Sequence, residues 1–112
     1  MEEQAFLDQH VFKGLKKLKD GFKEEEVPFF SASDFAILLE RAEYFGISIY
    51  SIEPWFEGAI YDVMTHENLK KKATDARWYT KAFQTFESRQ AGMTYSARMK
   101  VSPKLLARKS IQ

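Results

Sequence analysis

Apolar residues near the start of the chain are spaced as on one face of a helix. They recur at intervals of three or four residues at Leu7, Val11, Leu15 and Leu18. This spacing predicts an amphipathic helix over residues 3–19. Asp20-Gly21 is predicted to end the helix, because these residues tolerate positive φ. A connection follows, in which a short edge strand can form at Val27, Phe29 and Phe30.

A second helix has the clearest start and stop signals in the chain. Ser31-Ala32-Ser33-Asp34 predicts its start, since a serine hydroxyl can accept a hydrogen bond from a free helical amide. Gly46 stands where a left-handed residue would end the helix. Its predicted buried stripe contains Phe35, Leu38, Leu39, Ala42 and Phe45.

The rest of the chain predicts strands around one more helix. β-Branched and aromatic residues in 47–52 and 59–64 predict a hairpin with a loop at 53–58. Thr74 is predicted to cap a third helix, with Trp78 at the edge of its buried stripe. Residues 93–101 alternate between apolar and polar side chains and predict a strand. Its solvated face is expected to carry Thr94, Ser96, Arg98 and Lys100.

Together these elements predict one α+β domain over residues 1–112. A short helix at 103–109 completes the order helix, helix, strand, strand, helix, strand, short helix. We expect a mainly antiparallel sheet of about three strands, with the helices packed on one face. The last strand follows a helical crossover, so the sequence leaves open whether it pairs parallel or antiparallel.

Composition narrows the function classes. The chain has 112 residues, 45% of them hydrophobic, and it contains no cysteine. Disulfides, thiolate nucleophiles and cysteine-based metal sites are therefore excluded, and a cytoplasmic location is favoured. No apolar run approaches the ~20 residues that span a bilayer, so we expect no membrane insertion. A small soluble domain is the expected class.

Charge is unevenly placed along the chain. Residues 1–67 carry six Lys/Arg against fourteen Asp/Glu, a net −8, whereas residues 68–112 carry eleven against two, a net +9. This asymmetry indicates either a basic surface for an anionic partner or two segments that neutralise each other when packed. We favour mutual neutralisation, because folding brings distant segments together.

The hairpin loop is the leading candidate site. Trp55 and Phe56 place two large rings where a tight turn favours small or polar residues. Exposed aromatic residues anchor protein partners, so these rings, with Glu53 and Glu57 beside them, form a candidate partner-binding site. The competing interpretation, favoured by the size of tryptophan, is that the rings fold back over the end of the core.

An alternative site is basic. Arg98 and Lys100 on the last strand, with Arg77 and Lys81 on the third helix, can bind phosphates of a nucleic acid or another anionic ligand. Lys70-Lys71-Lys72 precedes them in the sequence. No RNP, zinc-finger or helix-turn-helix signature accompanies these residues, and a charge run is more often a solvated face.

Evidence for catalysis is weaker still. The two histidines are His10 and His66, and a base and acid at His66, Glu67 and Asp62 would need a geometry that the sequence does not specify. No motif for a cofactor or metal is present, so neither is expected. The sequence therefore predicts a non-enzymatic domain that binds a protein partner, with anion binding as the alternative. A homodimer through the exposed sheet face also remains open.

Overall fold

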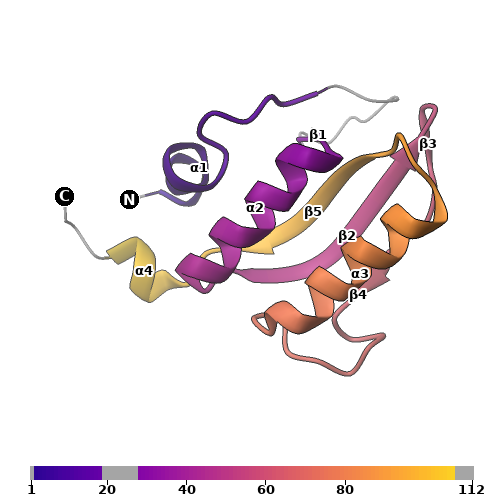
Figure 1. Cartoon of the computed structure of the whole chain (residues 1–112). Coiled ribbons are helices and arrows are strands. Elements are labelled where there is room, and N and C mark those ends of the chain that lie inside the picture. Colours follow the sequence, from indigo (N-terminus) through magenta and orange to yellow (C-terminus); the bar gives the residue numbers. More distant parts are fainter. Residues whose placement is uncertain (1, 19–27, 108–112) are drawn as a thin grey trace.

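The computed structural model describes residues 2–18 and 28–107 (Figure 1). A short helix α1 continues directly into one π-helical turn, and a two-residue strand precedes the long helix α2. The bounds are α1 Glu3–Phe6, the π-helical turn Leu7–Val11, β1 Phe30–Ser31, α2 Ala32–Phe45, β2 Ser48–Phe56, β3 Ala59–Ile60, β4 Met64–Thr65, α3 Ala76–Arg89, β5 Thr94–Lys100 and α4 Pro103–Ala107.

The sheet has the strand order β1-β5-β2-β3, and β4 also pairs with β2. Every pairing is antiparallel, which settles the orientation of β5 between β1 and β2. The α+β class is confirmed. The expected number of about three strands is too low, because β1 is added at one edge and the strand predicted at 59–64 is divided into β3 and β4.

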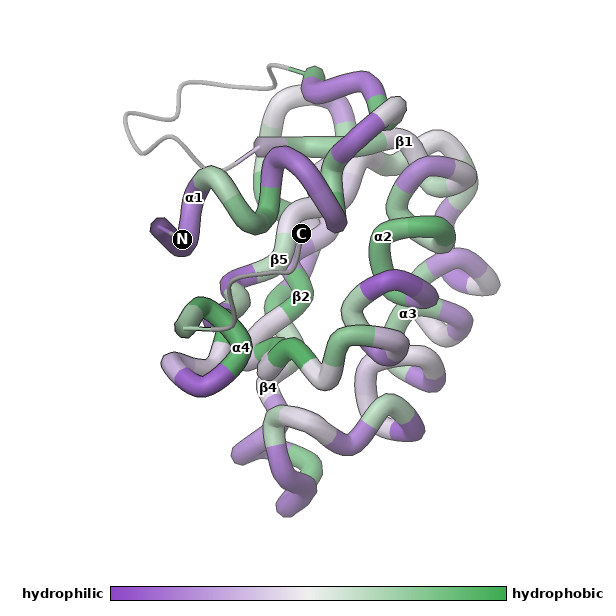
Figure 2. Tube along the Cα trace, turned by 90° about the vertical axis from the view of Figure 1, so that its left-hand side faces the viewer, coloured by the Kyte–Doolittle hydropathy of each residue, from purple (hydrophilic) through white to green (hydrophobic). Residues whose placement is uncertain are grey.

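One face of the sheet is buried under helices. Figure 2 shows α2 and α3 on the same side of β2 and β5, as predicted. Ile52 pairs with Ala97 and Pro54 with Tyr95, and all four are buried on this face. Side chains alternate along each strand, so the opposite face, here called the outer face, carries Ser51, Glu53, Trp55, Thr94, Ser96 and Arg98.

Aromatic rings connect the two helices to the sheet. The Tyr95 ring of β5 stacks on Phe35 of α2, with centroids 5.3 Å apart, and meets Phe83 of α3 edge-on at 4.9 Å. All three residues are buried. Aromatic pairs in these geometries add stabilisation beyond the area that they bury. This cluster fixes the sheet relative to both helices and so positions the outer face.

Helix α2 forms where its start and stop signals predict. Ser31 Oγ accepts a hydrogen bond from the Asp34 backbone amide at 3.3 Å, and Gly46 adopts φ +68 at the other end. Phe35, Leu38, Leu39 and Ala42 are buried as expected, and Phe45 is partly buried.

The helix predicted over residues 3–19 ends early, at Val11. Arg41 of α2 donates to the carbonyl oxygens of Val11 and Lys13 at 2.9 and 2.7 Å, and Gly14 turns the chain with φ +79. These carbonyls therefore have a tertiary partner in place of a further helical turn. Leu18 instead forms an isolated bridge with Phe29. Asp20, Gly21 and Val27 lie outside the described residues.

Helix α3 begins one residue later than predicted. Asp75, not Thr74, is its N-cap, and the Asp75 carboxylate accepts a hydrogen bond from the Arg77 amide at 3.0 Å. Trp78, expected at the edge of the stripe, is fully buried. Its ring lies against the Tyr79 ring edge-on and also faces His66. Through His66, the connection before α3 therefore lies against the core beside Trp78.

The last described helix lies near the first one (Figure 1). The described part of the terminal helix, α4, covers Pro103–Ala107 of the predicted 103–109. Just before it, the buried Val101 amide donates to Glu3 Oε2 of α1 at 2.8 Å. This bond holds α1 against the end of β5, beside α4 (Figure 1).

Candidate functional site

A tight turn joins β2 to β3. Its two central residues are Glu57 and Gly58, with φ values of +53 and +83. Trp55 pairs with Ile60 and Phe56 with Ala59 across the hairpin. Two successive residues with positive φ are typical of the type I′ turn, whose twist matches that of antiparallel strands. The six-residue loop predicted at 53–58 is therefore wrong, because β2 continues through Phe56.

Trp55 and Phe56 are strand residues on opposite faces of the sheet. Phe56 packs against the core, whereas Trp55 lies on the outer face and is half-buried. The Trp55 ring meets the buried Phe29 ring edge-on at 5.3 Å. Neither ring is the freely exposed loop anchor that the sequence suggested, and both contribute to packing.

Glu53 and Arg98 form a cross-strand ion pair on the outer face. Arg98 Nε donates to Glu53 Oε2 at 3.1 Å, and the Glu53 side chain is only 13% exposed. Ser96, which pairs with Glu53 in register, is buried, although the alternation predicted a solvated side chain. One predicted partner-binding residue and one predicted anion-binding residue thus bind each other.

The other candidate cations do not gather around Arg98. Lys100 follows it on the outer side of β5, whereas Arg77 and Lys81 are exposed on α3, which covers the opposite sheet face. Arg77 also forms a bidentate pair with Asp75 at 2.8 and 3.0 Å. Hydrogen bonding from the Arg77 side chain to the Asp75 carboxylate lowers the pKa of Asp75 to about 2. The four residues form no common patch.

The candidate acid and base residues have other partners. His66 Nδ1 lies 2.8 Å from the Lys71 carbonyl oxygen, and Asp62 Oδ2 lies 3.5 Å from Arg89 Nη1. Glu67 is exposed. His10, the other histidine, packs its ring against Phe6 and Phe45. Within residues 2–18 and 28–107, no three histidine or acidic side chains are grouped to hold a metal ion.

Three exposed apolar side chains lie beside β2, one in β3 and two in the connection from β3 to β4. Ile60, Tyr61 and Val63 are 49%, 40% and 42% exposed, and they fall within four consecutive residues. Tyr50 of β2 and Leu69 of the connection before α3 are also exposed, at 40% and 38%. We call these five residues the edge surface.

The edge surface begins beside Trp55. Ile60 pairs with Trp55, and the Tyr61 amide donates to the Pro54 carbonyl oxygen at 2.8 Å. At its other end, the His66 amide donates to the Tyr50 carbonyl oxygen, and the His66 ring lies 5.6 Å from the Tyr50 ring. Both ends are thus anchored to β2 by backbone hydrogen bonds.

The sequence predicts residues 59–64 as a strand and does not identify them as a site. A signal was present, since Ala59-Ile60-Tyr61-Asp62-Val63-Met64 lacks strict alternation of apolar and polar residues. Such a run fits a strand buried on both faces, or one with apolar side chains left in solvent. The structure leaves Ile60, Tyr61 and Val63 exposed to solvent, with residues 61–63 outside the two short strands.

Two further observations complete the description of the site. No helix among the described residues has the length and apolar character needed to cross a membrane. Comparison of the chain with protein-family models, with curated proteins and with solved structures finds no match.

Proposed function

We propose that this chain is a non-enzymatic binding domain and that a protein partner docks on the edge surface. The observation that carries the proposal is the adjacency of Ile60, Tyr61 and Val63, each at least 40% exposed, on one sheet edge. Single exposed apolar side chains are common on proteins, but a contiguous group is typical of an interaction site. Half-buried Trp55 extends the group beyond Ile60.

The chemistry of the edge surface favours a protein over a small or anionic ligand. Its residues are apolar or aromatic, and the charged pair beside them, Asp62 and Arg89, is internally matched. The core of a protein interface is similarly poor in unpaired charge and rich in aromatic side chains. Tyrosine also supplies a hydroxyl for the polar rim. The four residues of the anion-binding alternative, Arg77, Lys81, Arg98 and Lys100, form no common patch.

We infer that recognition uses side chains rather than addition of a strand. β3 and β4 have only two residues each, and residues 61–63 between them lie outside the sheet. A partner strand would find no continuous row of free amides and carbonyls there. Short, interrupted edge strands are a known means of preventing strand addition.

The test compares two double variants of the purified chain. Ile60→Ser/Val63→Ser changes the edge surface, and Ile37→Ser/Tyr44→Ser changes two exposed apolar residues of α2 as the matched control. Proteins captured from an extract of the source cells would be identified and their affinities measured with purified components.

We expect the edge variant to lose at least ten-fold in affinity for a partner that the control and the unmodified chain bind equally. A partner whose affinity changes equally in both variants, or in neither, would overturn the assignment of the edge surface.

A further inference from the structure

We propose that the partner on the edge surface is a second copy of this chain, related by a two-fold axis through the middle of that surface. This inference rests on the proposed function and specifies its partner. In such a dimer each residue of the surface contacts its counterpart region in the other copy, so the surface must be complementary to itself.

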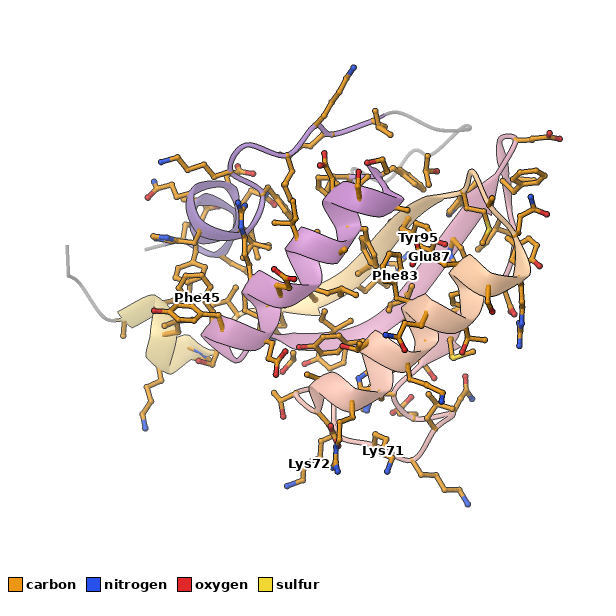
Figure 3. All side chains as sticks on the ribbon, in the orientation of Figure 1. Phe45, Lys71, Lys72, Phe83, Glu87 and Tyr95 are labelled. Atoms are coloured by element: carbon orange, nitrogen blue, oxygen red, sulfur yellow. The ribbon has the colours of Figure 1, made fainter. Side chains whose placement is uncertain are left out.

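The first observation is that the two ends of the edge surface carry opposite charge. Glu57 is exposed at the β2–β3 turn. At the other end Lys70, Lys71 and Lys72 are exposed. Figure 3 shows Lys71 and Lys72 extending from the connection before α3, at the opposite end of the molecule from the β3 turn seen in Figure 1. We call these ends the acidic tip and the lysine loop.

The second observation is that these charges do not neutralise each other within one copy. The lysine loop follows His66, which is bonded to Tyr50, and the acidic tip follows Phe56. Along β2, the six-residue step from Tyr50 to Phe56 covers about 20 Å. This separation between the two ends is about 2.5 times the distance over which physiological salt screens exposed charges. No ion pair of Lys70, Lys71 or Lys72 occurs within the described part of the chain.

Two-fold symmetry brings these opposite charges together. An axis through the middle of the edge surface reverses the second copy, so its lysine loop faces the first copy's acidic tip. The same contact occurs twice. The apolar residues Ile60, Tyr61 and Val63 then meet their own counterparts near the axis, beside the matched Asp62–Arg89 pair. A dimer with both copies in the same direction would instead oppose like charges.

Backbone conformation marks the same two ends. Among the described residues, the non-glycine residues with positive φ are Glu57 at +53 and Lys70 at +57. Side chains with a Cβ are disfavoured in this region, and glycine is not. One charged residue occupies such a position at the acidic tip and one in the lysine loop. This placement fits a role for both charges outside the folded chain itself.

The size of the surface sets the expected affinity. Residues 57–72, with Tyr50, Trp55 and Arg89, make 19 residues, close to the lower end of the range found in stable interfaces. We therefore expect a reversible dimer that dissociates in the micromolar range, and not an obligate one.

The experiment is sedimentation equilibrium of the full chain with reciprocal charge reversals. Glu57→Lys makes both ends basic, and Lys71→Glu/Lys72→Glu makes both ends acidic. Lys13→Glu/Lys104→Glu, which reverses exposed lysines away from the surface, is the control for net charge. Circular dichroism would verify that each variant is folded.

We expect each surface variant alone to dimerise at least ten-fold more weakly than the unmodified chain, and the control to be unchanged. An equimolar mixture of the two surface variants should regain the dimer, because both tip-to-loop contacts are then attractive again. Added salt should weaken the unmodified dimer and the mixed dimer alike.

Two results would overturn the inference. An unmodified chain that remains monomeric at several hundred micromolar would show that the partner is another protein, and the capture experiment above would then still decide the proposed function. A dimer that both charge-reversed variants form unchanged, or that mixing does not restore, would show that the acidic tip and lysine loop do not face each other.

Discussion

Replacing Glu57 by glycine should make the fold more stable and the proposed dimer weaker. Glu57 occupies the first central position of the β2–β3 turn with φ +53, where its Cβ is sterically disfavoured. Glycine removes that penalty and also removes the charge of the acidic tip. The two effects have opposite consequences, so one substitution separates folding from association.

The magnitude follows from two opposing terms. A residue with a Cβ loses about 1–2 kcal/mol in the left-handed region, and glycine loses about 0.5–1 kcal/mol more chain entropy on folding than alanine. The difference is a net stabilisation of about 0.5–1 kcal/mol. A 112-residue chain has an unfolding entropy of about 235 cal/mol/K, so the midpoint of thermal unfolding should rise by about 2–4 °C.

The assay is thermal unfolding followed by circular dichroism, at a concentration low enough for the chain to be monomeric. Gly58→Ala is the matched variant, because Gly58 has φ +83 and an added Cβ there would meet no atom within 4 Å. Its cost is therefore conformational, and we expect its midpoint to fall by a similar amount. If Glu57→Gly unfolds at a lower temperature than the unmodified chain, the assigned turn geometry is wrong.

Three further predictions concern the cap of α3, the hydrogen bond between Glu3 and Val101, and the buried Tyr79 hydroxyl. The folded pKa of Asp75, about 2, lies below its ordinary 3.8, so its carboxylate stabilises the fold above about pH 4 and loses this effect as the pH falls toward 2. In urea unfolding, Asp75→Asn should be less stable than the unmodified chain at pH 5 and equally stable at pH 2. Glu3→Ala should lower the free energy of unfolding by about 1–3 kcal/mol, because it leaves the buried Val101 amide without its acceptor. Replacing the exposed Glu2 by alanine should change this free energy by less than about 0.5 kcal/mol. Equal losses in the two variants would exclude that role for Glu3. Burial raises the pKa of Tyr79 to about 12, so unfolding, which restores a pKa near 10, becomes more favourable between pH 10 and 12. In a pH series of urea melts, Tyr79→Phe should reduce this loss of stability at alkaline pH. An unchanged loss of stability would show that another group causes it.

Local signals were sufficient to predict α2 and most of β5. Ser31 and Gly46 act within one turn of the helix ends that they fix, so their effect does not depend on the rest of the fold. Tyr95 and Ala97 alternate with polar neighbours and are buried as predicted. The same alternation fails at Ser96, which is buried on the outer face. The sequence of β5 alone contains no information on what covers that face.

Tertiary contacts explain the failure at the first helix. Its apolar spacing continues to Leu18, but Arg41 of α2 donates hydrogen bonds to the Val11 and Lys13 carbonyl oxygens. A residue about thirty positions away thus determines where the helix ends. The spacing of apolar residues within the helix contains no information on that contact. Leu18 forms a backbone bridge with Phe29 and does not continue a helical stripe.

The candidate site moved for a related reason. The sequence predicts Trp55 and Phe56 as loop residues, because six residues separate two apparent strands. A turn of only Glu57 and Gly58 is enough when both adopt positive φ, and glutamate is not among the residues that usually signal this. Moving the turn places Trp55 in β2 and leaves its paired neighbour, Ile60, exposed on the edge.

The uneven charge of the chain has two different outcomes in the fold. Arg98 with Glu53 and Arg89 with Asp62 join the basic and acidic halves, which is the mutual neutralisation favoured from the sequence. Lys70, Lys71 and Lys72 lie too far from the acidic tip to be neutralised in the same way. The two ion pairs that join the halves lie beside the edge surface, whereas the acidic tip and the lysine loop lie at its two ends. A second copy in the reversed direction therefore pairs each acidic tip with a lysine loop and leaves the existing ion pairs intact.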